Sequence, residues 1–232
     1  MPIALLSALA RCQPGPVLPL SLNGPGVARL DFSAANRLLT TTDLRDTAAF
    51  GRVVAEMLHQ QRATIGVGGY LENRAIYQRS PNLFGAGEPR TLHLGVDVWL
   101  PAGTPVLSPL PARVHSVGNN AGFGNYGPTV ILEHELEGIA FYSLYGHLAH
   151  HEWAALRAGQ VLAQGQAFAT VGAPPENGDW PAHLHFQLMS DMQGRQGDFP
   201  GVAAPSEREF WAIICPDPNL ILRIVDSNGL NR

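Results

Sequence analysis

The spacing of hydrophobic residues divides the chain into two parts that differ in predicted secondary structure. In the first part the clearest pattern covers 43–63, where apolar residues recur every three or four positions, as on one face of a helix. These positions are Phe50, Val53, Val54, Met57 and Leu58. We predict a helix there, capped by Thr42 or Asp43, and a strand over 65–70. The stretch 81–89 is predicted to be a loop.

From His93 onward, short apolar runs alternate with Gly, Pro and Asn, which is typical of short strands joined by turns. The predicted strands cover 95–99, 105–107, 112–117, 128–134, 139–146, 161–163, 167–171 and 183–189. Short helices are predicted over 150–157 and 206–214. The fold is therefore expected to be mainly β, with a small α/β segment before the strands and a short helix near the C-terminus.

The composition of the 232 residues supports a packed core and excludes several kinds of chemistry. Hydrophobic residues make up 45% of the chain and charged residues only 15%. All 15 basic residues are Arg, so the chain has no lysine for a Schiff base, a P-loop or a lipoyl or biotinyl attachment site. The net charge is -4 without any basic run, so nucleic acid is not an expected partner. No apolar run reaches the length of a membrane span.

The two cysteines bear on the cellular compartment. Cys12 and Cys215 could pair only across nearly the whole chain, which fits a reducing compartment better than a disulfide framework. The apolar run that begins at Met1 is short, follows no basic region and is interrupted by Arg11, so no signal peptide is expected. The sequence therefore predicts a cytoplasmic protein, with a periplasmic or exported one as the alternative.

Histidine is abundant, and one pair lies in a predicted strand. His183 and His185 are two residues apart, so in a strand both imidazoles would point to the same face. One ring could bind a metal while the other moves a proton. The alternative is a surface strand that carries two histidines by chance.

A second candidate is the pair His93 and Asp97, which are four residues apart. In a straight strand they would lie roughly 13 Å apart, too far for one ion. Gly95 could permit the bend that brings them together. An imidazole nitrogen and a carboxylate oxygen are a favourable pair of zinc ligands, whereas the alternative is a turn aspartate beside a peripheral histidine.

A third candidate is His147, which follows the apolar and aromatic run 141–145. It could act as a general base or hydrogen-bond donor at the same cleft, or simply end a strand. Two histidines and one aspartate from these motifs would make a three-ligand site with a fourth position open for water. That layout is typical of catalytic zinc, and no Cys pair is available for a structural site.

These motifs resemble the lysostaphin-like zinc metallopeptidases, many of which cut peptidoglycan cross-links. The resemblance runs from about Arg90 to about Leu188 and depends on HLGVD at 93–97, PAGTPV at 101–106, YGHL at 145–148, AGQVLAQGQ at 158–166 and HLHFQ at 183–187. It implies that His93, Asp97 and His185 bind one zinc ion per chain. It implies that His147 and His183 activate water or stabilise the oxyanion, and that the substrate is a peptide or is similar to peptidoglycan.

The resemblance also implies an organisation of the chain. Residues 1–90 would form an accessory segment that covers the groove, 91–190 the metallopeptidase-like domain, and 191–232 an extension packed on it. The segments 101–117 and 158–172 look like the halves of a barrel-sandwich hybrid, so the antiparallel sheet is expected to close into a barrel-like domain.

The loops 118–127 and 172–182 should form walls of the groove. Three aromatic residues in them are candidates for substrate contacts: Phe123, Tyr126 and Trp180. His134 is expected to have a structural role.

Two other functions remain open from the sequence. The same fold could serve as a non-catalytic binding or regulatory module. The chain could instead be an intracellular metal-dependent hydrolase of a small substrate unrelated to the cell wall. For the latter, the stretches NYGP, LYGHL, ENGDWPAHLHFQ and CPDPN resemble a domain found fused between a kinase-like and an aminotransferase-like domain.

Overall fold

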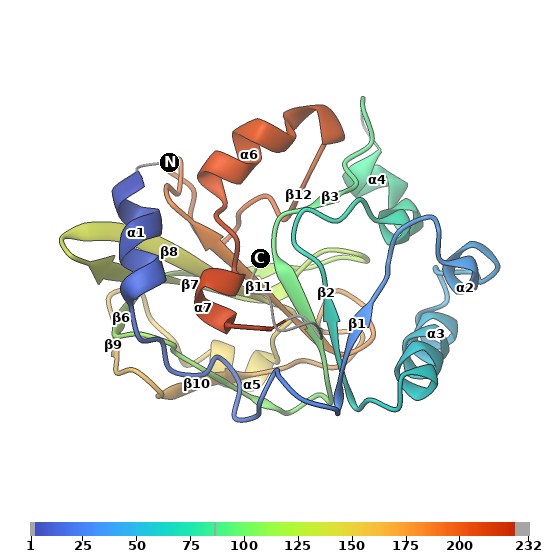
Figure 1. Cartoon of the computed structure of the whole chain (residues 1–232), viewed down its shortest axis with the longest axis horizontal. Coiled ribbons are helices and arrows are strands. Elements are labelled where there is room, and N and C mark those ends of the chain that lie inside the picture. Colours follow the sequence, from blue (N-terminus) through green and yellow to red (C-terminus); the bar gives the residue numbers. More distant parts are fainter. Residues whose placement is uncertain (1–2, 86, 226–232) are drawn as a thin grey trace.

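A computed structural model of the protein describes residues 3–85 and 87–225, which form short helices around one large sheet (Figure 1). The helices are α1 (Ile3–Arg11), α2 (Arg37–Thr40), α3 (Thr47–Gln60), α4 (Pro81–Phe84), α5 (His150–Trp153), α6 (Arg208–Ile214) and α7 (Asn219–Leu222), with 3₁₀ turns at Ala75–Arg79 and Pro205–Glu207. The strands are β1 (Val27–Leu30), β2 (Ile65–Gly68), β3 (Leu92–His93), β4 (Val96–Trp99), β5 (Pro105–Leu107), β6 (Ala112–Asn120), β7 (Gly127–Leu136), β8 (Ile139–Gly146), β9 (Val161–Leu162), β10 (Ala167–Thr170), β11 (His183–Met189) and β12 (Val202–Ala203).

The large sheet has eight strands in the order β1-β2-β4-β11-β8-β7-β6-β9, and two small sheets pair β10 with β5 and β12 with β3. The prediction of a mainly β protein is confirmed. The sheet is mixed, however, because β1 and β2 run parallel and the chain crosses between them through α2 and α3. Pairing among the described strands leaves the large sheet open, so closure into a barrel is not confirmed.

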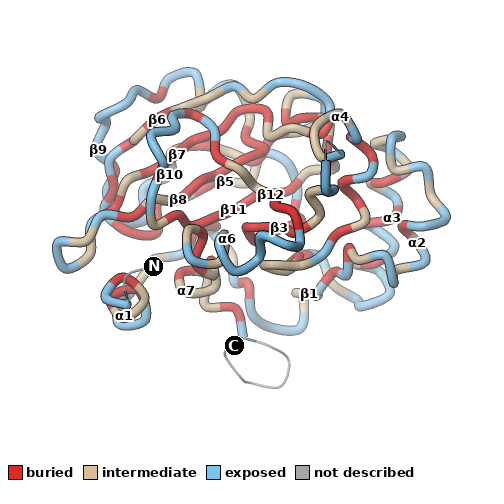
Figure 2. The backbone as a smooth tube through the Cα atoms, turned by 90° about the horizontal axis from the view of Figure 1, so that it is seen from above, coloured by how far each residue is buried: buried red, intermediate tan, exposed pale blue. Residues whose placement is uncertain are grey.

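Strands β4 and β11 are buried along their whole length at the centre of the large sheet, because both of its faces are covered (Figure 2). On one side α3 packs its predicted apolar residues against Trp99 and Trp180. The other end of the molecule carries α1, which packs beside α7 (Figure 1). None of the helices in the described part of the chain combines the length and apolar character needed to cross a membrane.

The predicted elements fall close to those observed, with two corrections. Helix α3 begins at Thr47, and its cap is Asp46, whose carboxylate accepts hydrogen bonds from the backbone of Ala48 and Ala49. Neither Thr42 nor Asp43 caps it. The predicted loop over 81–89 contains the single helical turn α4, which begins at Pro81.

The segment before residue 90 contributes β1 and β2 to the same sheet as the later strands. Strand β2 pairs directly with β4, placing Gly68 opposite Asp97. The division into three segments at residues 90 and 190 stays a prediction.

Candidate metal centre

Strand pairing brings the candidate ligands together from three strands. Asp97 on β4 lies directly opposite His185 on β11, so their side chains share one face of the sheet. His93 ends β3, and the break at Leu94 and Gly95 separates β3 from β4. This interruption supplies the bend that the spacing of His93 and Asp97 required.

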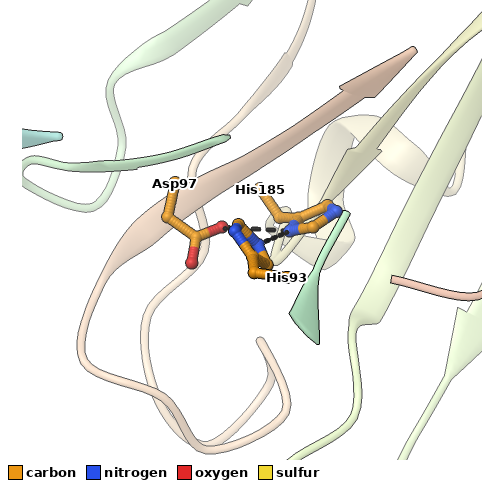
Figure 3. Close-up of side chains that lie close together, drawn as sticks. All are labelled: His93, Asp97 and His185. Carbon is orange, nitrogen blue, oxygen red and sulfur yellow. Dashed lines mark hydrogen bonds and ion pairs between the residues drawn. The ribbon is translucent and has the colours of Figure 1, made fainter. Parts of the chain in front are cut away.

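Three ligand atoms converge at the centre of this group (Figure 3). Nδ1 of His185 lies 3.0 Å from Nε2 of His93 and 3.0 Å from Oδ1 of Asp97. Nε2 of His93 lies 3.3 Å from the same Oδ1. In a tetrahedral zinc site with bonds of about 2.0–2.1 Å, neighbouring ligand atoms are roughly 3.3 Å apart. The spacing therefore suits a zinc ion.

The hydrogen bonds on the far side of each ring fix which nitrogen carries the proton. Nδ1 of His93 donates to the carbonyl oxygen of Gly69 at 3.0 Å, and Nε2 of His185 donates to Oε1 of Gln187 at 3.0 Å. The converging nitrogens, Nε2 of His93 and Nδ1 of His185, are therefore lone-pair donors. Together with the carboxylate oxygen of Asp97 they form a buried set of two imidazole nitrogens and one carboxylate oxygen, which suits a divalent metal.

Burial and neighbouring charges hold two members of this set, His93 and Asp97, in the protonation states that metal binding needs. Burial, and then the guanidinium of Arg74, lower the pKa of His93 to about 4. For Asp97, burial favours the neutral acid, but His93 and Arg74 outweigh it and hold the pKa well below its usual value. At neutral pH the imidazole of His93 is neutral and Asp97 is ionised.

Gly95 makes room for one candidate ligand. A Cβ atom at this position would lie 2.6 Å from Cε1 and 2.7 Å from Nε2 of His185. It would also lie 2.8 Å from the backbone oxygen of Phe186. Glycine is therefore required here for close packing.

The two histidines expected to act on water lie together beside this group. The rings of His147 and His183 are 4.2 Å apart between centroids, and both side chains are buried. Nδ1 of His147 donates to the carbonyl oxygen of Asn177 at 2.8 Å, and Nδ1 of His183 donates to that of Pro181 at 2.8 Å. Each Nε2 is therefore an acceptor.

Burial lowers the pKa of His183 to about 4, and burial followed by the neighbouring His183 lowers that of His147 well below its usual value. Trp99 stacks on His183 with ring centroids 4.1 Å apart, which fixes the orientation of that imidazole.

A loop built around Asn177 holds His147 in place. The buried amide of Asn177 donates to the carbonyl oxygens of Gly172 and Trp180 and accepts from the backbone N–H of Trp180. The indole of Trp180 donates to the carbonyl oxygen of Asn125, which joins this loop to 121–126. Gly178 lets the two loops approach closely, because a Cβ atom there would lie 1.8 Å from the backbone oxygen of Asn125.

A cleft of about 310 Å³ opens beside the candidate ligands. Asp97, His147, His183 and His185 are among its polar lining residues. Tyr126 and Trp180 line it as predicted, whereas Phe123 is not among the lining residues. Its remaining walls come from the N-terminal segment, the loop before Tyr126 and the C-terminal extension: Ile76, Tyr77, Leu83, Phe84, Arg90, Gly124, Asn125, Arg195 and 198–202.

Arg74 is a residue of this site that sequence reasoning missed. Its side chain is fully buried and forms an ion pair with Oδ2 of Asp97, while Nε donates to Glu72 at 2.8 Å. A single arginine in an irregular segment has no periodic signal. Only the two charged residues Glu72 and Arg74, in a stretch from 63 to 78 that is otherwise uncharged, could have drawn attention to it.

The other histidines lie outside the group. His134 is buried, where its ring contacts the carbonyl oxygen of Pro111 and the hydroxyl of Ser143. This placement agrees with the structural role expected for it.

Comparisons with known proteins agree with the motifs. Residues 91–198, slightly less than half of the chain, match the family model of Peptidase family M23. The uncharacterized lipoprotein YgeR of Escherichia coli strain K12 is 30% identical over 94 residues, which are 40% of this chain and 33% of that protein. This chain thus spans about a third of the length of that curated relative.

Solved structures with similar segments include a zinc containing peptidase from Vibrio cholerae. It has 26% identity and a TM-score of 0.33, over 42% of this chain and 27% of that one. The catalytic domain of the antimicrobial peptidase lysostaphin from Staphylococcus simulans has 22% identity and a TM-score of 0.37, over 52% of this chain and 80% of that one. The family expected from the motifs is confirmed for residues 91–198 by the family model.

Proposed function

Because residues 91–198 belong to Peptidase family M23, we propose that this protein is a zinc-dependent hydrolase of amide bonds, of the metallo-endopeptidase type. His93, Asp97 and His185 would bind one zinc ion. The observation that carries the proposal is the convergence of two imidazole nitrogens and one carboxylate oxygen within 3.0 to 3.3 Å of one another. When bound, zinc would polarise the scissile carbonyl and lower the pKa of a water molecule at its open coordination position.

His147 and His183 would move the proton. Both present Nε2 as an acceptor at the cleft, because Nδ1 of each donates to a backbone carbonyl. Either ring can accept a proton from the attacking water and then, as an imidazolium, donate a hydrogen bond to the negative oxygen of the tetrahedral intermediate. The depressed pKa values of both rings keep them neutral, and therefore able to accept that proton, at neutral pH.

The shape of the cleft supports a small substrate. At about 310 Å³ it is at the lower end of the range for small-molecule sites, and segments before residue 91 and after 194 restrict it. Its apolar surface comes from side chains such as Tyr77, Phe84 and Phe199. We therefore expect the substrate to be a short peptide, with Gly-containing peptides among the candidates. The second candidate, a metal-dependent hydrolase of a small substrate unrelated to the cell wall, is favoured by the same restriction.

The cellular compartment is part of the proposal. Cys12 and Cys215 are both free thiols, which supports the cytoplasm. The similar protein from Escherichia coli is named as a lipoprotein, which supports export instead. Fractionation of cells expressing the natural protein, followed by immunoblotting, distinguishes the two locations.

Metal content tests the proposal first. Mass spectrometry of the purified protein should find about one zinc per chain, and Asp97→Asn and His185→Ala should lose it because each removes one ligand. His151→Ala is the matched control, because its side chain is 95% exposed. Wild-type protein that stays metal-free when zinc is supplied would contradict the proposal.

Hydrolysis is the second test, with short peptides and muropeptides as alternative substrates and product masses as the readout. His147→Ala and His183→Ala should retain zinc and lose about 10²- to 10⁴-fold in rate. Cleavage of muropeptides alone would favour a cell-wall enzyme. Zinc binding without cleavage of any substrate would favour the non-catalytic module.

A further inference from the structure

Residues 69–74, which precede the segment that matches the family, run alongside β3 and contact two of the three candidate ligands. The backbone N–H of Leu71 donates to the carbonyl oxygen of His93, and the N–H of His93 donates to that of Glu72. The N–H of Arg74 then donates to the carbonyl oxygen of Thr91. We call this segment, 69–74, the strap.

The strap holds one carboxylate oxygen of Asp97. Arg74 Nη1 forms an ion pair with Oδ2, and this leaves Oδ1 directed at His93 and His185. The guanidinium is fully buried beneath Phe32, whose ring centroid lies 5.2 Å from Cζ. Gly68 makes space for it, since a Cβ atom there would lie 2.4 Å from Nη2. These contacts and the burial of the side chain fix the position of the guanidinium.

Glu72 connects this contact to the second ligand. Its carboxylate accepts from Nε of Arg74 at 2.8 Å, from the backbone N–H of Phe32 at 2.8 Å and from the N–H of Gly69 at 3.3 Å. The carbonyl oxygen of the same Gly69 accepts from Nδ1 of His93. One network in the strap therefore orients both Asp97 and His93.

We propose that the strap is an integral part of the metal centre, with Arg74 and Glu72 as positioning residues for Asp97 and His93. This inference rests on the proposed function, because it assumes that these side chains bind zinc. It assigns to the N-terminal segment a role beyond covering the groove. Removing the strap would release one carboxylate and one imidazole from their fixed orientations, and metal affinity would fall rather than rise.

The physical reason is that a free carboxylate rotates and can present either oxygen, whereas the Arg74 contact leaves only Oδ1 facing the other ligands. Partners behind metal ligands typically contribute 10- to 100-fold in metal affinity. Arg74 also offsets the negative charge of the buried Asp97 and the partly buried Glu72, so losing it leaves both carboxylates without their shared cation.

Zinc affinity of the full chain tests the proposal, measured by competition with a chromogenic chelator. Arg74→Met should weaken zinc binding 10- to 100-fold. Arg74→Lys, which keeps the charge but loses the fork geometry, should recover part of that loss. Glu72→Gln should weaken binding less than Arg74→Met. The absorption spectrum of the Co²⁺-loaded protein should change in the same variants, since it reports coordination geometry.

Arg79→Met is the matched control, because Arg79 is another buried arginine of the N-terminal segment that stacks on Phe123 and Trp180 and contacts none of the three ligands. Circular dichroism checks folding of every variant. If Arg74→Met does not fold, Arg74→Lys and Glu72→Gln decide the question.

Folded Arg74 variants that bind zinc as tightly as wild type would overturn the proposal, and so would an equal loss in Arg79→Met. Those results would leave the proposed function intact. A wild-type protein that binds no zinc would overturn both.

Discussion

Replacing Gly95 with alanine tests whether space beside His185 is essential to the metal centre. The added Cβ atom would lie 2.6 Å from Cε1 and 2.7 Å from Nε2 of the imidazole, and real Cβ contacts essentially never fall below 3.0 Å. The imidazole must therefore move by at least about 0.4 Å, about twice the ±0.2 Å within which metal–ligand distances usually stay. Movement of the backbone is no easier, because the oxygen of Phe186 lies 2.8 Å from the same Cβ position.

The displacement also strains the hydrogen bond between His185 and Gln187, which sets the orientation of the coordinating nitrogen. We expect Gly95→Ala to weaken zinc binding at least tenfold, by analogy with other changes behind metal ligands. Overpacking should lower the free energy of unfolding of the metal-free protein by about 1–3 kcal/mol. Chelator competition measures the first quantity and denaturant unfolding with excess chelator measures the second.

Gly51→Ala is the control, because Gly51 lies within α3 and a Cβ atom there meets nothing within 4 Å. That change should leave zinc affinity unaltered and stabilise the protein by about 1 kcal/mol through helix propensity. A Gly95→Ala protein with wild-type zinc affinity would refute the argument, because it would show that the site accommodates the displacement.

Three further predictions follow from buried groups. Burial lowers the pKa of His134 to about 4, so the unfolded chain takes up its proton first as pH falls below about 6.5. Between pH 7.5 and 5, the free energy of unfolding of chelator-treated protein should therefore fall by about 2 kcal/mol because of this residue. In His134→Gln the decrease over the same pH range should be about 2 kcal/mol smaller. Asn177→Ala should reduce the rate of hydrolysis at least tenfold with zinc content unchanged, because the loop that holds His147 loses three hydrogen bonds. Removing zinc with a chelator should lower the melting temperature, and the decrease should be absent in His185→Ala.

Each of these predictions has an outcome that contradicts it. Equal acid sensitivity of wild type and His134→Gln would show that His134 takes up its proton equally in both states. Loss of zinc from Asn177→Ala would mean that the loop supports the metal ligands and not only His147. An unchanged melting temperature after chelation would show that the native state binds no stabilising metal.

The sequence predicted which residues come together in the candidate metal centre, but not the contacts that hold them in place. His93, Asp97 and His185 stand in short motifs whose spacing limits how they can be arranged, and strand pairing brings them together. The bend near Gly95 was expected from the distance a straight strand would impose. The close contact of Gly95 with His185 was not, because it depends on two segments 90 residues apart in the sequence.

The features that the sequence did not predict depend mostly on contacts between distant segments, which leave no local pattern in the sequence. Arg74 pairs with Asp97 because β2 pairs with β4, a contact that periodicity within either segment does not predict. The parallel pairing of β1 and β2 was missed for the same reason. Helix α3 was placed correctly by its apolar residues, but several Thr and Asp residues precede it and only the structure identifies Asp46 as the cap.

The position of β11 has a consequence for the order in which the molecule assembles. It is among the last strands in the chain, yet it lies between β4 and β8 at the middle of the sheet. The neighbours β6, β7 and β8 follow one another and pair locally, so we expect them to form early, whereas β4 has no partner on that side until residue 183 is available. The candidate metal centre can then exist only after this late insertion. Bound zinc would therefore slow unfolding, in which β11 separates from β4 and β8, more than it would speed the early strand pairing during folding.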